Sequence, residues 1–211
     1  ILTSPTPAPI LTSPTPAPEP TPEPNPTSEP DTTPESIQTI DGFTQFTDAE
    51  DSLTEQIDIK IRMLGGNDYV EITGGIDNFV NGNKGKDTLK VLGGEKSVFL
   101  GGVDADTFEV LGGIDNSFNG QLGDDKFVIR DGRLQALGGD DNDTIEVLGA
   151  KEGSQVNGNK GKDTITGSAA ITYRGGAGDD VIQVSQGEVW GDLGVDVFRG
   201  VTGEGYAVIQ D

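Results

Sequence analysis

Histidine and cysteine are both absent from this chain of 211 residues. Their absence excludes, or nearly excludes, zinc, haem and iron–sulfur sites, and also Ser-His-Asp and Cys-His catalysis, because these need imidazole or thiolate groups. A chain without cysteine is also compatible with an oxidising environment outside the cell.

Basic residues and long apolar runs are scarce. The chain has 14 Lys and Arg against 36 Asp and Glu, a net charge of -22 and a pI near 4.1. This balance argues against binding to nucleic acid or to anionic membranes, since both need clustered positive charge. No apolar run approaches the ~20 residues that cross a bilayer, so we expect no membrane span. The chain begins with Ile and shows no signal peptide, so we expect a processed or trimmed product.

Proline and glycine divide the chain. All 12 prolines lie at or before Pro34, whereas the 32 glycines follow residue 41. Residues 1–36, rich in Pro, Thr, Ser and Glu, predict an extended tail or linker. Residues 37–63 predict an N-terminal cap or irregular first coil. In it, Thr47–Glu50 fits a capping box that opens a short helix, or an irregular coil that places Asp51 one step before Asp68.

A repeat occupies residues 64–211. Its most regular feature is a series of aspartates spaced 19, 19, 19, 18, 20, 17 and 16 residues apart. These are Asp68, Asp87, Asp106, Asp125, Asp143, Asp163, Asp180 and Asp196. A period near 20 residues is typical of a solenoid, in which each repeat stacks on the next.

The residues around each aspartate keep the same register. The second residue after it is apolar in all eight repeats, as is the seventh residue before it. The fifth residue before it is Gly in seven repeats, with Met63 as the exception. The second residue before it is Gly in six, with Asp104 and Asp141 as exceptions. Each repeat therefore predicts a Gly-rich turn, the Asp, a short strand, a second turn and a second short strand.

These units predict an all-β fold. About 19 residues per coil leave three to five residues per strand, which favours a flattened roll of two sheets. Strands of successive coils would pair in parallel, ~4.8 Å apart. We expect a right-handed parallel β-roll or β-solenoid of about eight coils, preceded by the extended Pro-rich tail.

The repeat resembles the RTX, or haemolysin-type, calcium-binding repeat, whose consensus is GGxGxDxUx with U a large apolar residue. The segments that carry the resemblance are GNKGKDTLK (82–90), GQLGDDKFV (120–128), GNKGKDTIT (158–166), GGAGDDVIQ (175–183) and GDLGVDVFR (191–199), with weaker matches in GGVDADTFE (101–109) and GGDDNDTIE (138–146). The resemblance implies a right-handed parallel β-roll that holds Ca2+ between stacked turns, with the eight aspartates as side-chain ligands. This chain differs from the family in that only every second turn carries the motif, which suggests that one edge of the roll, not both, binds calcium.

Calcium also suits the residues themselves, since it takes six to eight oxygens from carboxylates and carbonyls. We expect the best sites between turns 120–125 and 138–143 and between turns 175–180 and 191–196. Weaker sites are expected at the turns that carry Lys84, Lys86, Lys160 and Lys162. The alternative is that each Asp merely closes its own turn through an Asx hydrogen bond.

Two functions fit this pattern. The first is a non-enzymatic, secreted or cell-surface calcium-binding module with a structural or adhesive role. We expect it to self-associate end to end into a filament, with help from the tail, and to contact a cell-surface polysaccharide. The second is the C-terminal calcium-dependent secretion and folding module of a larger exported enzyme or toxin. Weaker alternatives are an ice-binding face along Thr88, Thr107, Thr144 and Thr164 and a polysaccharide lyase. Trp190 is either a sugar platform or packs against a turn.

Overall fold

The computed structural model describes residues 38–55, 58–201 and 205–210. The tail expected over residues 1–36 lies outside these residues. Within them every regular element is a β-strand, and no helix long and apolar enough to cross a membrane occurs in this part of the chain.

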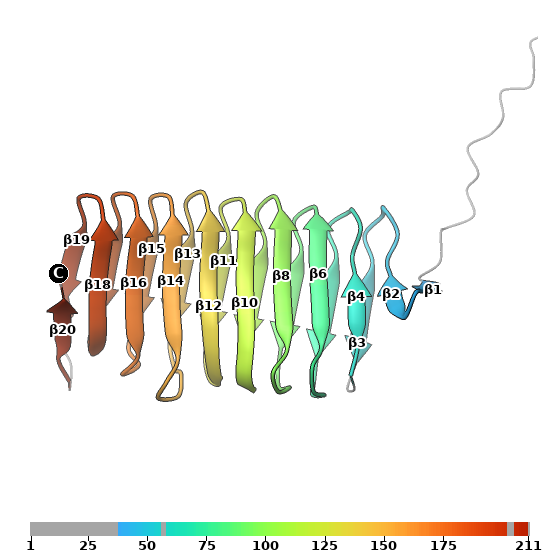
Figure 1. Ribbon diagram of the computed structural model, residues 1–211, viewed down its shortest axis with the longest axis horizontal. Coiled ribbons are helices and arrows are strands. Elements are labelled where there is room, and N and C mark those ends of the chain that lie inside the picture. Colours follow the sequence, from blue (N-terminus) through green and yellow to red (C-terminus); the bar gives the residue numbers. More distant parts are fainter. Residues whose placement is uncertain (1–37, 56–57, 202–204, 211) are drawn as a thin grey trace, which may run out of the picture. The chain divides into compact units, whose positions relative to one another are not determined.

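The strands form two sheets (Figure 1). The even sheet contains, in spatial order, β1 (Gln38–Ile40), β2 (Phe43–Gln45), β4 (Lys60–Arg62), β6 (Phe79–Lys84), β8 (Val98–Val103), β10 (Ile114–Leu122), β12 (Arg133–Asp140), β14 (Gln155–Lys160), β16 (Thr172–Ala177), β18 (Gly187–Leu193) and β20 (Ala207–Gln210). The odd sheet contains β3 (Ser52–Glu55), β5 (Tyr69–Ile72), β7 (Thr88–Val91), β9 (Thr107–Val110), β11 (Lys126–Ile129), β13 (Thr144–Val147), β15 (Thr164–Gly167), β17 (Val181–Val184) and β19 (Val197–Gly200).

The chain alternates between the sheets, so that each coil adds one strand to each. Figure 1 shows the even strands rising in front and the odd strands descending behind, which makes the coil right-handed. Neighbouring strands are parallel and in register: Phe127 pairs with Phe108 on one side and Ile145 on the other. The predicted all-β parallel solenoid of about eight coils is confirmed.

The interior is built from columns of apolar side chains. The residues two positions after the repeated aspartates, from Val70 to Ile182, are buried. So are those seven positions before them, from Ile61 to Val189. Within these columns Phe99 stacks on Phe118 with ring centroids 4.9 Å apart, and Phe108 stacks on Phe127 at 4.5 Å. Large side chains thus repeat at the same height in adjacent coils, which fixes the register of the stack.

The N-terminal cap is an irregular first coil. The alternative of a helix at 47–50 is wrong, because the Thr47 amide and hydroxyl both donate to Asp51 Oδ2 at 2.7 Å. Before it, β1 pairs antiparallel with β2 across a two-residue turn. Asp41 and Gly42 occupy this turn with φ of 53° and 77°, and an Asp-Gly pair favours such a tight hairpin.

Candidate functional site: a buried aspartate column

The eight predicted aspartates lie along one edge of the roll. Each directly precedes an odd strand, β5 to β19, at the turn where the chain leaves the even sheet. Seven of them, Asp68 to Asp180, are at most 2% exposed, whereas Asp196 in the last turn is half-buried. The side chains therefore point into the roll. We call these eight residues the aspartate ladder.

Each ladder carboxylate accepts a hydrogen bond from the coil before it. The Asp87 amide donates to Asp106 Oδ1 at 2.8 Å, and the Asp143 amide donates to Asp163 Oδ1 at 2.7 Å. The same bond recurs from Asp51, which joins the ladder from the first coil, to Asp196. These bonds join residues 16 to 20 positions apart, so the carboxylates link coils rather than closing their own turns as the Asx alternative requires.

The second carboxylate oxygen has no such partner. In the described residues, Oδ2 of every ladder residue from Asp68 to Asp180 is buried and accepts no hydrogen bond. Asp51 differs, because its Oδ2 accepts both bonds from Thr47. A buried oxygen without a donor costs roughly 1–3 kcal/mol, and more where it is charged. Seven such oxygens in one column require a shared physical explanation.

The glycine five residues before the aspartates from Asp87 onward forms the other half of the arrangement. A Cβ on Gly120 would lie 2.0 Å from Asp125 Oδ2 and 2.3 Å from the carbonyl oxygen of Gly138 in the next coil. The same pair of oxygens surrounds the glycines of the other coils from Gly82 to Gly175. Glycine is required here because two oxygens occupy the space that a methyl group would fill.

Strand pairing is interrupted at these glycines. Between β6 and β8, Asn81 pairs with Leu100 and Asn83 with Gly102, but Gly82 is skipped. The same gap recurs in the pairs from β8 to β18. The backbone thus departs from the regular ladder where the glycine carbonyls approach the carboxylates. Both oxygens around each glycine are acceptors, so neither can satisfy the other with a hydrogen bond.

Burial raises the pKa of the ladder carboxyls, while the backbone hydrogen bond from the preceding aspartate lowers it and neighbouring carboxylates raise it further. The pKa rises to about 8 for Asp106 and Asp143 and to about 7 for Asp87 and Asp125. It rises to about 6 for Asp68 and Asp163, and it is also raised for Asp180. The ionised form of these carboxyls is therefore disfavoured unless a positive charge lies beside them.

Glycine two residues before each aspartate has a different role. Its positions adopt positive φ, for example 125° at Gly123 and 138° at Gly161. Asp104 and Asp141, which break the glycine column in the sequence, keep the same conformation with φ of 81° and 84°. Their side chains accept the amides of Gly85 and Gly123 in the coils before them. These exposed carboxylates form a second acidic row outside the ladder.

The lysine-bearing turns do not neutralise the ladder. Lys160 pairs with Asp140 at 2.9 Å, and Lys162 pairs with Asp179 at 3.7 Å. Neither partner is a ladder residue. Across the described residues, Lys84 and Lys86 form no ion pair at all. In the described residues, lysine therefore forms no ion pair with the ladder at the turns where weaker calcium sites are expected.

The opposite edge carries a second ladder, which sequence reasoning missed. The Asn78 amide donates to Ser97 Oγ at 3.1 Å and the Ser97 amide donates to Asn116 Oδ1 at 3.0 Å, as in the aspartate ladder. Here the side-chain amide also supplies a donor, because Asn78 Nδ2 donates to the carbonyl of Gly74 at 3.0 Å. Asn and Ser at a spacing of 19 residues, in GGIDN and GGEKS, were the available signal. On this neutral edge the side chains supply hydrogen-bond donors as well as acceptors, whereas the buried Oδ2 atoms of the acidic edge have no donor.

Any cation at the acidic edge would depend on backbone oxygens. In the described part of the chain no three or more acidic, His or Cys side chains converge to hold a metal together. The fit is one orphaned carboxylate oxygen near a glycine carbonyl of the next coil, in the six coils from Asp87 to Asp180. Comparisons with family models, with curated proteins and with solved structures find no match for this chain.

Proposed function

We propose that this chain is a non-enzymatic structural module, related in design to the RTX roll, in which Ca2+ along the aspartate ladder holds the coils together. The observation that carries the proposal is the column of seven buried Oδ2 atoms without donors, six of which, from Asp87 to Asp180, lie near a glycine carbonyl of the next coil. Calcium binds carboxylate and carbonyl oxygens in variable geometry, which suits a site that repeats with small differences.

The residues that would hold the cation are the ladder aspartates and the glycines that face them. One of the gaps favoured by sequence lies between the turns of Asp125 and Asp143, where Gly138 supplies the facing carbonyl. When bound, calcium supplies positive charge between oxygens that have no proton donor. The roll then gains stability through linkage, because the folded stack binds the cation and the unfolded chain does not.

The burial of the ladder favours a structural role over catalysis. Carboxyls with pKa values raised to between about 6 and about 8 are candidates for acid–base chemistry in principle. These lie at most 2% exposed between stacked coils, so a substrate has no access to them. We therefore assign their unusual environment to cohesion of the stack.

The composition of the sites supports a location outside the cell. Each coil contributes only one ladder carboxylate, and calcium affinity falls as the charge count falls. Sites of this kind fill where calcium is millimolar, as it is outside cells. The same logic fits the alternative that the roll is the calcium-dependent folding module of a longer exported protein. An adhesive role remains part of the proposal, and so does tail-assisted filament formation once the β1–β2 hairpin is displaced.

The test is thermal unfolding of the chain, with calcium titrated from a chelated baseline and magnesium as a comparison. We expect the melting temperature to rise with calcium over the millimolar range, and calorimetry to detect binding at the same concentrations. A variant with Asp106→Asn, Asp125→Asn and Asp143→Asn should lose much of the calcium response, because amides then supply the missing donors.

Two outcomes would reject calcium as the ligand. If the melting temperature is the same in calcium and in chelator, the ladder does not use the metal. If acid alone stabilises the roll and calcium adds nothing at any pH, protons occupy the ladder instead. A matched variant with Asp77→Asn, Glu109→Gln and Glu146→Gln removes three charges from outside the ladder and should keep the full calcium response.

A further inference from the structure

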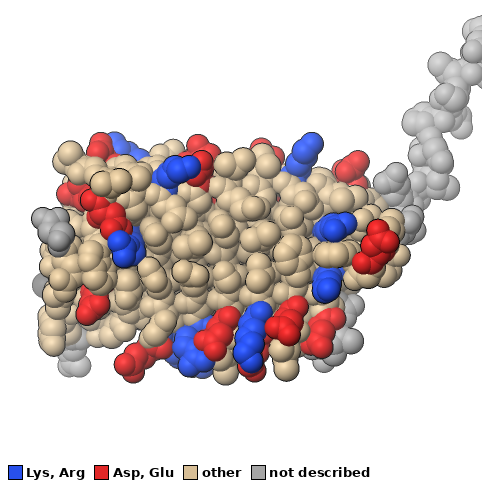
Figure 2. Space-filling model, viewed as in Figure 1, with Lys and Arg blue, Asp and Glu red and all other residues tan. Residues whose placement is uncertain are grey.

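The outer face of the even sheet is largely uncharged in a protein of net charge -22. Figure 2 shows neutral residues across the middle of this face, with charged side chains mainly toward its edges. On β6 to β14 most outward side chains before the last residue of each strand are neutral. The charged exceptions, Asp115 near the start of β10 and Arg133 at the start of β12, pair with each other. The neutral ones include Asn81, Asn83, Asn119, Gln121, Asn157 and Asn159. Solubility does not explain this neutrality, because an acidic protein could carry charges here at little cost.

Amide side chains recur on this face in every second coil. Asn83, Gln121 and Asn159 stand at equivalent positions, and Gly102, Gly139 and Gly176 occupy that position in the coils after them. The row therefore alternates between an amide ridge and a gap with no side chain. Strands ~4.8 Å apart place successive ridges roughly 10 Å apart along the roll.

The amide ridges occupy strained backbone. Asn83, Gln121 and Asn159 have φ of 68°, 79° and 75°, where glycine would be less costly. The backbone N–H of each ridge residue donates to the asparagine two residues before it. Gln121 N–H donates to Asn119 Oδ1 at 3.0 Å, and Asn159 N–H donates to Asn157 Oδ1 at 3.0 Å. Non-glycine residues retained in left-handed conformation commonly mark functional positions.

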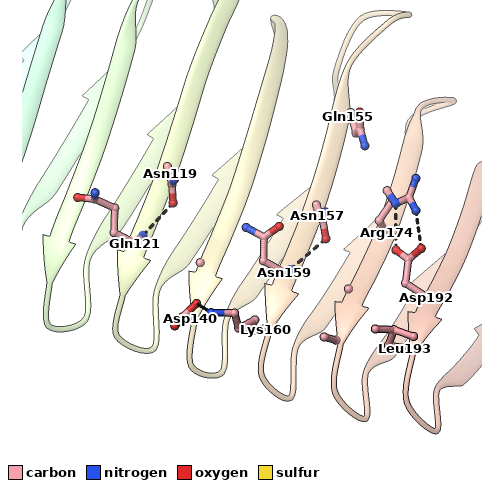
Figure 3. Close-up of a pocket in the computed structure, with 13 residues that line it drawn as sticks. Asn119, Gln121, Asp140, Gln155, Asn157, Asn159, Lys160, Arg174, Asp192 and Leu193 are labelled. Carbon is pink, nitrogen blue, oxygen red and sulfur yellow. Dashed lines mark hydrogen bonds and ion pairs between the residues drawn. The ribbon is translucent and has the colours of Figure 1, made fainter.

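The gaps open into a groove. It has a volume of about 780 Å³ and crosses β10, β12, β14, β16 and β18 along the axis of the roll. Figure 3 shows the side chains of Asn119, Gln121, Asn157 and Asn159 along it, with the Arg174–Asp192 pair toward β18. A second notch of about 340 Å³ over Gly102, between Asn83 and Gln121, continues the row toward β6. Trp190 lies beside Arg174, with the guanidinium carbon 5.5 Å from the ring centroid.

We propose that this row of notches, from Asn83 to Asp192, binds a neutral, extended polysaccharide chain that lies along the axis of the roll. Amides offer paired donors and acceptors that match sugar hydroxyls. The gaps over glycine admit pyranose rings close to the backbone. The ridge spacing is comparable to a disaccharide unit of an extended β-linked chain, so the same contacts repeat along the ligand. A neutral ligand also avoids repulsion from the strongly acidic protein.

An anionic glycan fits poorly, because Asp140 and Asp192 lie at the groove. An apolar protein partner fits poorly as well, because it would leave the side-chain NH2 groups of Asn119, Gln121 and Asn157 without acceptors. The groove lies on the outer surface of the even sheet, whereas the ladder carboxylates lie buried inside the roll. The inference therefore goes beyond the calcium proposal and needs only that the roll is folded.

The test measures binding of cellohexaose by calorimetry and by chemical-shift changes, in calcium and under conditions where circular dichroism shows a folded roll. Maltohexaose serves as a neutral chain of different shape, and a polygalacturonate oligomer serves as an anionic one. We expect binding of cellohexaose and at least tenfold weaker binding of both others. A variant with Asn83→Gly, Gln121→Gly and Asn159→Gly should lose at least tenfold in affinity. These substitutions suit the left-handed backbone, so the variant should fold as well as the parent chain.

Asp77→Gly is the matched control, because it also replaces a left-handed residue, with φ of 55°, but on the opposite edge of the roll. It should bind cellohexaose as the parent does. Equal affinity of the triple variant and the parent would reject the groove. A folded parent that binds no neutral oligosaccharide would reject the polysaccharide, whatever the calcium melts show. A dimer that the triple variant abolishes, without any glycan binding, would assign the face to a second copy of the chain.

Discussion

At the scale of the residue, the two edges of the roll place an amide and a carboxylate in similar surroundings. Asn78 on the neutral edge accepts a bond from the coil before it and donates through Nδ2 to the carbonyl of Gly74. Asp106 on the acidic edge accepts the corresponding bond, but its Oδ2 faces the carbonyl of Gly120 with nothing to donate. The acidic edge therefore destabilises the folded roll unless a cation or a proton binds there. This makes the stability of the roll depend on calcium and on pH.

Asp106→Asn tests this comparison at a single rung. The new amide should donate to the carbonyl of Gly120, so the metal-free protein should melt about 5 °C higher, since one orphaned oxygen costs roughly 1–3 kcal/mol and a chain of this size gains about 2–4 °C per kcal/mol. The increment produced by calcium should shrink. Asp106→Ala leaves the Asp87 amide without its acceptor and should lower the melting temperature in both conditions. A metal-free melt in which Asn is as harmful as Ala would contradict the argument.

The glycines of the acidic edge allow a second residue-scale prediction. Gly120→Ala places a methyl group within 2.3 Å of two oxygens, so we expect a loss of about 3 kcal/mol or more in the free energy of unfolding in urea. Gly200→Ala is the control, because its Cβ would meet nothing within 4 Å. It should change the free energy of unfolding by less than about 0.5 kcal/mol. Equal effects of the two substitutions would show that the space around Gly120 is not tightly packed.

At the scale of the element, short strands were predictable because interior positions repeat. The apolar residues two after and seven before each aspartate correctly indicate one strand in each sheet per coil. The ladder aspartates were also correctly placed on one edge. Their inward orientation was not predictable, since the spacing is the same whether a side chain points in or out. It follows from the glycine five residues before, which leaves room for Oδ2, as Gly138 does for Asp143.

The second turns show why the neutral edge was missed. They looked irregular because GGIDN, GGEK and RDGR differ in sequence. In the structure Gly75, Gly94, Gly113 and Gly132 keep φ between 92° and 111°, and Ile76, Glu95 and Ile114 form bridges between coils. These turns share a backbone conformation although their sequences differ. The polar residue that links coils is Asn or Ser, and both satisfy the same acceptor role.

Asn78→Asp tests the neutral ladder as an element. The change replaces an amide that donates to Gly74 O and Ser97 Oγ with a buried carboxylate that cannot donate. We expect a loss of about 2–4 kcal/mol in the free energy of unfolding at pH 7. The deficit should shrink at pH 4, where the new carboxyl can bind a proton and donate again. Urea unfolding at both pH values measures this difference, and a deficit that does not change with pH would contradict the role assigned to Nδ2.

At the scale of the whole molecule, the two ends of the roll differ. The even sheet begins with antiparallel β1, which covers the edge of β2. A copy stacked directly with β3 on β19 would place its β2 where β20 already lies, because β20 extends the even sheet beyond β19. Filament formation by simple end-to-end stacking therefore requires the β1–β2 hairpin to move. Such coverage is a common protection of sheet edges.

Negative-stain microscopy in calcium tests this consequence. We expect few filaments from the intact chain and more from a variant with Asp41→Pro and Gly42→Val, which removes the positive φ that the hairpin turn needs. Circular dichroism and the calcium melt should confirm that the roll itself persists in the variant. Abundant straight filaments from the intact chain, unchanged in the variant, would show that the hairpin is no barrier.

The ladder also determines how the whole molecule should respond to pH. Burial raises the folded-state pKa of its carboxyls from 3.8 to between about 6 and about 8, so over that window the folded chain binds more protons than the unfolded chain. The stability they contribute is complete below the unfolded pKa and is lost as pH rises through the folded values. Without metal, the melting temperature should therefore rise by the order of 10 °C from pH 8 to pH 5.

Calcium should flatten that pH profile, because the cation competes with protons for the same oxygens and stabilises the roll most where the ladder is ionised. General relief of the -22 charge would also favour acid conditions, so the slope alone does not identify the ladder. The triple variant at Asp106, Asp125 and Asp143 should lose much of the slope. The triple surface variant at Asp77, Glu109 and Glu146 removes the same number of charges and should keep it. Equal slopes in the two variants would assign the pH response to net charge and leave the ladder without a part in it.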